Sequence, residues 1–125
     1  MKNAVLKYYL KGYNCSQCIL RAAEDAYGVN ISKSSIKMCQ GITTGFGIGG
    51  MCSALIACIM VLSLMFDEVA VKRLRLDLLN RFQEKHGTLN CGKLKAERKG
   101  KQCENLISEI AEIMDDLIQD ELANQ

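Results

Sequence analysis

A continuous apolar segment from Cys52 to Phe66 constrains the fold of this chain more than any other feature. Thiols aside, its only polar side chains are the hydroxyls of Ser53 and Ser63. The segment is about four helical turns long, whereas a helix needs ~20 residues to cross a bilayer. A helix that is apolar on every side is stable at the centre of a bundle, where other helices cover it. We therefore predict a buried central helix over residues 52–66 and no membrane insertion.

Helical periodicity and helix caps recur on both sides of that segment. They indicate helices over residues 3–12, 15–27, 36–44, 52–66 and 68–86, and a last one that begins near residue 102. Asn14 suits the capping position before the second helix, and Gly28 follows its end, where a left-handed glycine is common. Residues 1–125 contain no proline and no alternating β pattern, and their number suits one domain. We expect a single-domain, all-α bundle of five or six helices.

Cysteine is the unusual component of the composition, with seven in the chain. The number is odd, and the first residues, MKNAVLKYYLKGYNC, lack the apolar run and cleavage site of a secretory signal. We therefore expect a cytoplasmic protein without a disulfide framework of the secreted kind. In a reducing compartment, several cysteines indicate redox chemistry or metal binding. The net charge of +2 is too small to indicate nucleic acid binding.

Four of the cysteines stand where a helix is predicted to begin: Cys15, Cys52, Cys91 and Cys103. The first and third each follow an asparagine, the second follows a run of glycines, and the last falls in the first turn of the final helix. Backbone N–H groups and the macrodipole at a helix start favour an anion, so they lower the pKa of a thiol from about 8.5. Basic residues between positions 93 and 101 act in the same direction. These thiols are the redox candidates, and the alternative is that they are small packing residues.

Four segments also carry a family resemblance: YNCSQ at 13–17, GFGIGGMCSALIA at 45–57, NCG at 90–92 and KQCENLISEIAEIMDDL at 101–117. Together they resemble the redox-active family named for the pattern C_GCAxxG_C_C, over residues 12 to about 117. The resemblance implies a small all-helical protein that depends on four cysteines. These fall on the same four positions that helix starts indicate: Cys15, Cys52, Cys91 and Cys103.

The chain departs from the family at its central motif. In this family the motif reads Cys-Gly-Ala-x-x-Gly, whereas Ser53 and Ala57 replace the two glycines here. Both replacements are small, so neighbouring helices can still approach, but less room remains beside the backbone of Cys52. The resemblance therefore still implies a functional thiol at Cys52, and a ligand pressed against the backbone is less expected.

Three further cysteines lie outside the family pattern. Cys18 forms a CxxC with Cys15 at a helix start, a spacing that supplies an attacking and a resolving thiol in thioredoxin-like proteins. No βαβ pattern surrounds it, so a thioredoxin fold is excluded. Cys18 is either a resolving thiol or a packing residue on its helix. Cys39 and Cys58 are predicted to lie in the core.

Metal binding is the main alternative to redox chemistry. Cys15, Cys52, Cys91 and Cys103 could bind zinc or an iron–sulfur cluster, each of which is held by four thiolates. His86 is close enough in sequence to join such a site, although a histidine at a helix C-terminus often acts only through its charge. The wide spacing of the cysteines, without paired CxxC motifs, does not favour this alternative.

The glycine-rich segment 45–50, GFGIGG, matches GxGxxG. A dinucleotide site needs a preceding strand and a βαβ unit, and neither is visible. We interpret the glycines as a sharp turn before the central helix. The backbone amides of Gly47, Gly49 and Gly50 are expected to form a nest that binds an anion or stabilises a thiolate at Cys52.

The leading hypothesis is a thiol redox protein, an oxidoreductase or electron carrier whose four thiols meet at one end of the bundle. Its partner would be a redox protein, a small thiol or an anion. The first alternative is a module that binds zinc or an iron–sulfur cluster. The second is a helical interaction protein that pairs with itself as a homodimer or with another protein and needs none of its cysteines.

Overall fold

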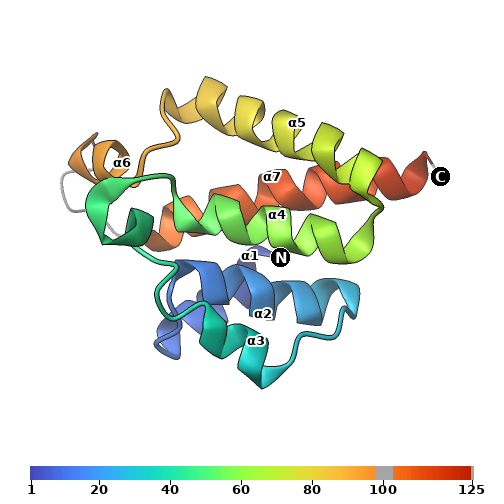
Figure 1. Ribbon diagram of the computed structural model, residues 1–125, viewed down its shortest axis with the longest axis horizontal. Helices are drawn as coiled ribbons and strands as arrows, with labels where there is room; N and C mark the ends of the chain where they lie inside the picture. Colours follow the sequence, from blue (N-terminus) through green and yellow to red (C-terminus); the bar gives the residue numbers. More distant parts are fainter. Residues whose placement is uncertain (98–102, 125) are drawn as a thin grey trace.

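Within residues 1–97 and 103–124, which the computed structural model describes, the chain forms seven α-helices (Figure 1). Side chains at positions 2, 95–97, 103 and 104 lie outside this description. The helices are α1 (Lys2–Leu10), α2 (Cys15–Tyr27), α3 (Lys33–Met38), α4 (Ser53–Met65), α5 (Glu68–His86), α6 (Cys91–Glu97) and α7 (Cys103–Ala123), and a short turn, η1 (Gly45–Gly49), precedes α4. The described residues contain no named strand. The predicted all-α fold is confirmed.

Helix α4 lies at the centre of the bundle, as the apolar segment predicts. It packs against α2, α5 and α7, and α1 packs against α2 and α7. Figure 1 shows α5, the α4–α7 pair and α2 one below another. The buried residues of α4 cover more than half of its circumference: Ser53, Ala54, Leu55, Ala57, Cys58, Val61 and Leu62. Burial of a single Leu or Val side chain is worth about 1.5–3 kcal/mol, so α4 contributes much of the stability.

No helix within the described residues is both long enough and apolar enough to span a bilayer. Helix α4 has 13 residues, and its second half reaches the surface, where Leu64 is 57% exposed.

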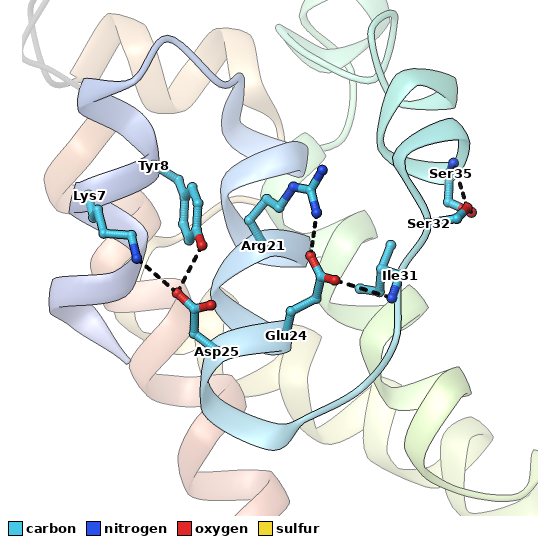
Figure 2. Close-up of polar contacts among 8 residues, drawn as sticks. All are labelled: Lys7, Tyr8, Arg21, Glu24, Asp25, Ile31, Ser32 and Ser35. Carbon is cyan, nitrogen blue, oxygen red and sulfur yellow. Dashed lines mark hydrogen bonds and ion pairs between the residues drawn. The ribbon is translucent and has the colours of Figure 1, made fainter.

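Two polar contacts attach α1 to α2, as Figure 2 shows. The Tyr8 hydroxyl donates to Asp25 Oδ2 at 3.0 Å, and the Lys7 ammonium lies 3.3 Å from the same oxygen. The hydrogen bond from Tyr8, with a smaller effect of Lys7, holds the pKa of Asp25 below its usual value. These contacts therefore hold α1 against α2.

The connection from α2 to α3 is also held by side chains (Figure 2). The Glu24 carboxylate accepts the backbone N–H of Ile31 at 3.3 Å, and Ser32 Oγ accepts the N–H of Ser35 at 3.2 Å. The second bond is an N-cap, which explains why α3 begins earlier than the helix predicted at residue 36.

The sequence predicts a helix start at Cys91, but it indicates a basic loop over residues 93–101, so the length of α6 is not predicted. Asn90 Oδ1 accepts the N–H of Lys93 at 3.0 Å, so this asparagine caps a helix as Asn14 does. The first part of the expected loop is therefore helical. Residues 98–102, which complete it, lie outside the described residues.

Candidate functional site

The turn before α4 is left-handed. Four successive residues have positive φ: Thr44 at 55°, Gly45 at 59°, Phe46 at 65° and Gly47 at 79°. Such angles cost a residue other than glycine about 1–2 kcal/mol, so Thr44 and Phe46 are strained. A Cβ atom on Gly45 would lie 2.3 Å from the backbone nitrogen of Gly50, so only glycine fits there. The turn closes through the N–H of Gly50, which donates to the Gly45 carbonyl at 2.9 Å.

Two of the three backbone amides expected to form an anion nest are used within the turn itself. The Gly47 N–H donates to the Thr44 carbonyl at 3.1 Å, and the Gly50 N–H is used to close the turn. Gly47, Gly49 and Gly50 are also not among the residues that line the cavity described below. The amides of Gly47 and Gly50 are therefore not available to an anion.

Two backbone hydrogen bonds join this turn to the loop before α6. The Cys52 N–H donates to the Leu89 carbonyl at 2.9 Å, and the Cys91 N–H donates to the Gly50 carbonyl at 2.6 Å. Two cysteines that are far apart in the sequence are therefore held in neighbouring segments, one before α4 and one at the start of α6.

Met51 and Asn90 face each other at the middle of this antiparallel bridge. The hydrogen bonds flank them on both sides, so they form a non-hydrogen-bonded pair, in which Cα atoms approach to about 4.5 Å. Cys52 and Cys91 come next in their segments and are diagonal neighbours across the bridge, a relationship that places two residues about 7–8 Å apart on the same face of a regular ladder.

Cys15, Cys52 and Cys91 line one cavity of about 200 Å³. They stand at or just before the starts of α2, α4 and α6, which Figure 1 shows at the same end of the bundle. The other lining residues are Tyr9, Asn14, Thr43, Thr44, Ser53, Leu94, Leu106 and Ile107. The structure thus brings together three of the four predicted thiols. Cys103 begins α7, and its side chain lies outside the described residues.

Burial dominates the ionisation of the Cys52 thiol. It raises the pKa to about 11, while the backbone N–H groups of Ala54 and Leu55 act in the opposite direction. The predicted lowering of the pKa is therefore wrong for Cys52. Only 6% of this residue is exposed, and the cost of desolvating a thiolate exceeds the favourable field of the helix start.

Cys15 is the most accessible of the three cavity cysteines, since it is half-buried while Cys52 and Cys91 are buried. Its Sγ lies 3.7 Å from the hydroxyl oxygen of Thr43. The position of Cys15 is fixed by Asn14, whose side chain accepts the N–H of Gln17 at 3.0 Å in the capping box of α2.

The four-cysteine pattern is recognised by one family model. The model described as "Putative redox-active protein (C_GCAxxG_C_C)" matches residues 13–117, which is most of the chain. The chain belongs to this family. The description assigns a redox role to C_GCAxxG_C_C proteins in general terms. Comparisons with curated proteins and with solved structures gave no match.

In this C_GCAxxG_C_C protein, the cysteines outside the family pattern are core residues. Cys18 is fully buried, its thiol donates to the Tyr13 carbonyl at 3.4 Å, and burial raises its pKa to about 12. Cys39 and Cys58 are also fully buried, which confirms their predicted place, and burial raises the pKa of both. None of the three lines the cavity.

His86 is not among the residues lining the cavity and connects α5 to α7. Its Nε2 lies 2.9 Å from Glu109 Oε2, and its ring lies against Phe82 with 4.5 Å between the ring centroids. Among the side chains that the structure describes, no three of His, Cys, Asp or Glu come close enough together to hold a metal ion. Cys103, the fourth predicted ligand, is outside that set.

Ser53 is a site residue that the sequence analysis treats only as a small residue. It lines the cavity, is 1% exposed, and its hydroxyl has no hydrogen-bond partner among the described residues. Ser63 of the same helix instead donates to the Ile59 carbonyl at 2.8 Å. A buried hydroxyl without a partner costs about 1–3 kcal/mol. The sequence marks Ser53 as a replacement of a family glycine, but it does not show that the hydroxyl lacks a partner, because that depends on tertiary packing.

Proposed function

We propose that this C_GCAxxG_C_C protein is a thiol redox protein whose cavity cysteines alternate between two thiols and a disulfide. The observation that supports this function is the single cavity lined by Cys15, Cys52 and Cys91. A disulfide needs Cα atoms about 4.4–6.8 Å apart, and three helix starts that meet at one cavity favour that approach. The cytoplasm is the proposed compartment, because reducing conditions there return such disulfides to thiols.

Cys15 is the proposed first nucleophile because it is the accessible thiol of the cavity. Its thiolate attacks a disulfide and forms a mixed disulfide with one half of it. Cys52 or Cys91 then attacks the sulfur of Cys15 and releases the second half. Cys52, with its pKa raised to about 11, is a neutral thiol near pH 7 and must lose its proton before it attacks. Cys103 is a further candidate from the family pattern.

The test is a thiol count on protein purified and reduced without oxygen, then equilibrated in thiol–disulfide buffers. We expect a reversible loss of two thiols per chain in the wild type. Cys15→Ala, Cys52→Ala and Cys91→Ala are compared with Cys39→Ala, a matched control for a core cysteine. At least one cavity variant should lose the reversible step while the control keeps it.

Two outcomes contradict the proposal. One is an internal disulfide that forms equally in the three cavity variants and the control. The other is a content of one zinc or iron atom per chain in the wild type and in Cys39→Ala, with no metal in the cavity variants. That result supports the metal-binding alternative.

A further inference from the structure

The dimensions of the cavity limit which substrate can reach its thiols, and this inference depends on the proposed function. The cavity holds about 200 Å³. Pockets for drug-sized ligands span roughly 300–1,000 Å³, and an engineered cavity of about 150 Å³ holds benzene. The space beside Cys52 and Cys91 therefore suits a small molecule better than a disulfide carried by a folded protein.

The walls of the cavity indicate the chemistry of that molecule. The described lining residues carry no ammonium, guanidinium or carboxylate group. Asn14 is already occupied, because its Oδ1 accepts the Gln17 N–H and its Nδ2 donates to the Cys39 carbonyl at 3.0 Å. Thr43 lies against the Cys15 thiol. Among the described lining residues, the Ser53 hydroxyl is thus the buried polar group without a hydrogen-bond partner, and a ligand can supply that partner.

We infer that the cavity binds a small, uncharged disulfide that bears a hydroxyl or carbonyl group, which pairs with the hydroxyl of Ser53. The Cys15 thiolate attacks one sulfur, the substrate S–S bond breaks, and the first half leaves as a thiolate that takes a proton from water. Cys52 or Cys91 then attacks Cys15 Sγ, and the second half leaves with that thiol's proton. Two electrons pass from the protein thiols to the substrate, and the protein keeps a disulfide.

Bis(2-hydroxyethyl) disulfide is the probe. Glutathione disulfide, which is larger and charged, and insulin, which is a protein, are the comparators. We measure the rate at which each disulfide oxidises the reduced protein. To correct for the intrinsic reactivity of the disulfide, this rate is divided by the rate at which the same disulfide oxidises dithiothreitol at the same pH. We expect the normalised rate for the hydroxyethyl probe to exceed both others by about tenfold or more, which is the discrimination a shaped pocket commonly provides.

Ser53→Ala tests the hydrogen bond, with Ser63→Ala as its control on the same helix. The rate with the hydroxyethyl probe should fall roughly threefold to tenfold in Ser53→Ala and stay unchanged in Ser63→Ala. The thermal midpoint of reduced Ser53→Ala should rise by about 2–5 °C, because the substitution removes a buried hydroxyl without a partner. A slower reaction in a more stable protein excludes unfolding as the cause.

The outcomes separate this inference from the proposed function. If the protein is oxidised and glutathione disulfide or insulin reacts as fast as the probe, the substrate class is wrong and the redox function stands. An unchanged rate in Ser53→Ala also overturns the role of Ser53. If none of the three disulfides oxidises the protein, both the inference and the proposed function fail.

Discussion

The backbone N–H of Cys91 donates to the carbonyl of Gly50 at 2.6 Å, which connects the start of α6 to the turn before α4. The bond from Cys52 to Leu89 completes this connection. Both bonds use backbone atoms only. Replacement of either cysteine by alanine therefore leaves the connection in place, and a loss of redox activity in such a variant reports on the sulfur itself.

The left-handed turn gives the first prediction. Gly45→Ala places a Cβ atom 2.3 Å from the Gly50 nitrogen at a φ of 59°, so we expect a loss of about 2–4 kcal/mol in the free energy of unfolding. At Gly41 a Cβ atom meets nothing within 4 Å, and Gly41→Ala should change this energy by less than about 0.5 kcal/mol. Urea denaturation of both variants measures the difference. Equal losses would contradict the geometry of the turn.

The second prediction concerns the pH dependence of alkylation at Cys52. Since its pKa is raised to about 11, labelling of this residue by iodoacetamide should be slow at neutral pH and continue to increase up to about pH 11. Peptide mass spectrometry of the folded protein follows the residue directly. A plateau below about pH 8.5, the value for an unperturbed thiol, would show that burial does not control Cys52.

The same pKa predicts how stability changes with pH. The folded state favours the neutral Cys52 thiol. This preference contributes fully to the free energy of unfolding below about pH 8.5, the pKa of cysteine in the unfolded chain, and the contribution is lost as the pH rises toward 11. The free energy of unfolding of the wild type should therefore fall over this range more than that of Cys52→Ala. Parallel curves for the two proteins would count against the shift.

The contact between α2 and α7 gives a third prediction. The Tyr27 hydroxyl donates to Asp115 Oδ1 at 2.6 Å, and Tyr27→Phe should cost about 1–2 kcal/mol of unfolding free energy near pH 7. Burial and, second, this hydrogen bond raise the pKa of Tyr27, so the folded state keeps the neutral phenol. The cost should shrink above about pH 10, where tyrosine in the unfolded chain ionises. A cost that is independent of pH would contradict this.

The contact between α1 and α2 should respond to acid. The pKa of Asp25 is lowered chiefly by the Tyr8 hydroxyl, so this carboxylate stabilises the fold above about pH 4, and the contribution is lost as the pH falls through the lowered value. Because Asp25 is exposed, Tyr8→Phe should cost at most about 0.5–1 kcal/mol near pH 7 and almost nothing near pH 2. Acid and neutral denaturation curves of the variant test this, and an equal cost at both pH values would argue against the contact.

Local signals explain why much of the fold can be predicted from sequence. Asn14 and Gly28 are at the predicted ends of α2, and the apolar segment 52–66 lies within the core as α4. Each of these signals acts over one or two helical turns. Local signals also mark Cys15, Cys52 and Cys91 as helix starts, whereas their convergence on one cavity comes from the packing of the helices.

Features that depend on tertiary packing could not be predicted. Thr44 and Phe46 adopt left-handed angles that their residue types rarely take, so the form of the turn has no local signal. The raised pKa of Cys52 comes from burial by other helices, although its helix start indicates the opposite. Ser53 replaces a glycine of the family motif, but that position does not show that its hydroxyl lacks a partner while the hydroxyl of Ser63 has one.

The most direct test of the central claim is disulfide mapping by mass spectrometry after oxidation of the reduced protein with a small disulfide. We predict an internal bond between two of Cys15, Cys52, Cys91 and Cys103. A bond that includes Cys18, Cys39 or Cys58, or oxidation that only links separate chains, would contradict a shared thiol cavity as the functional site.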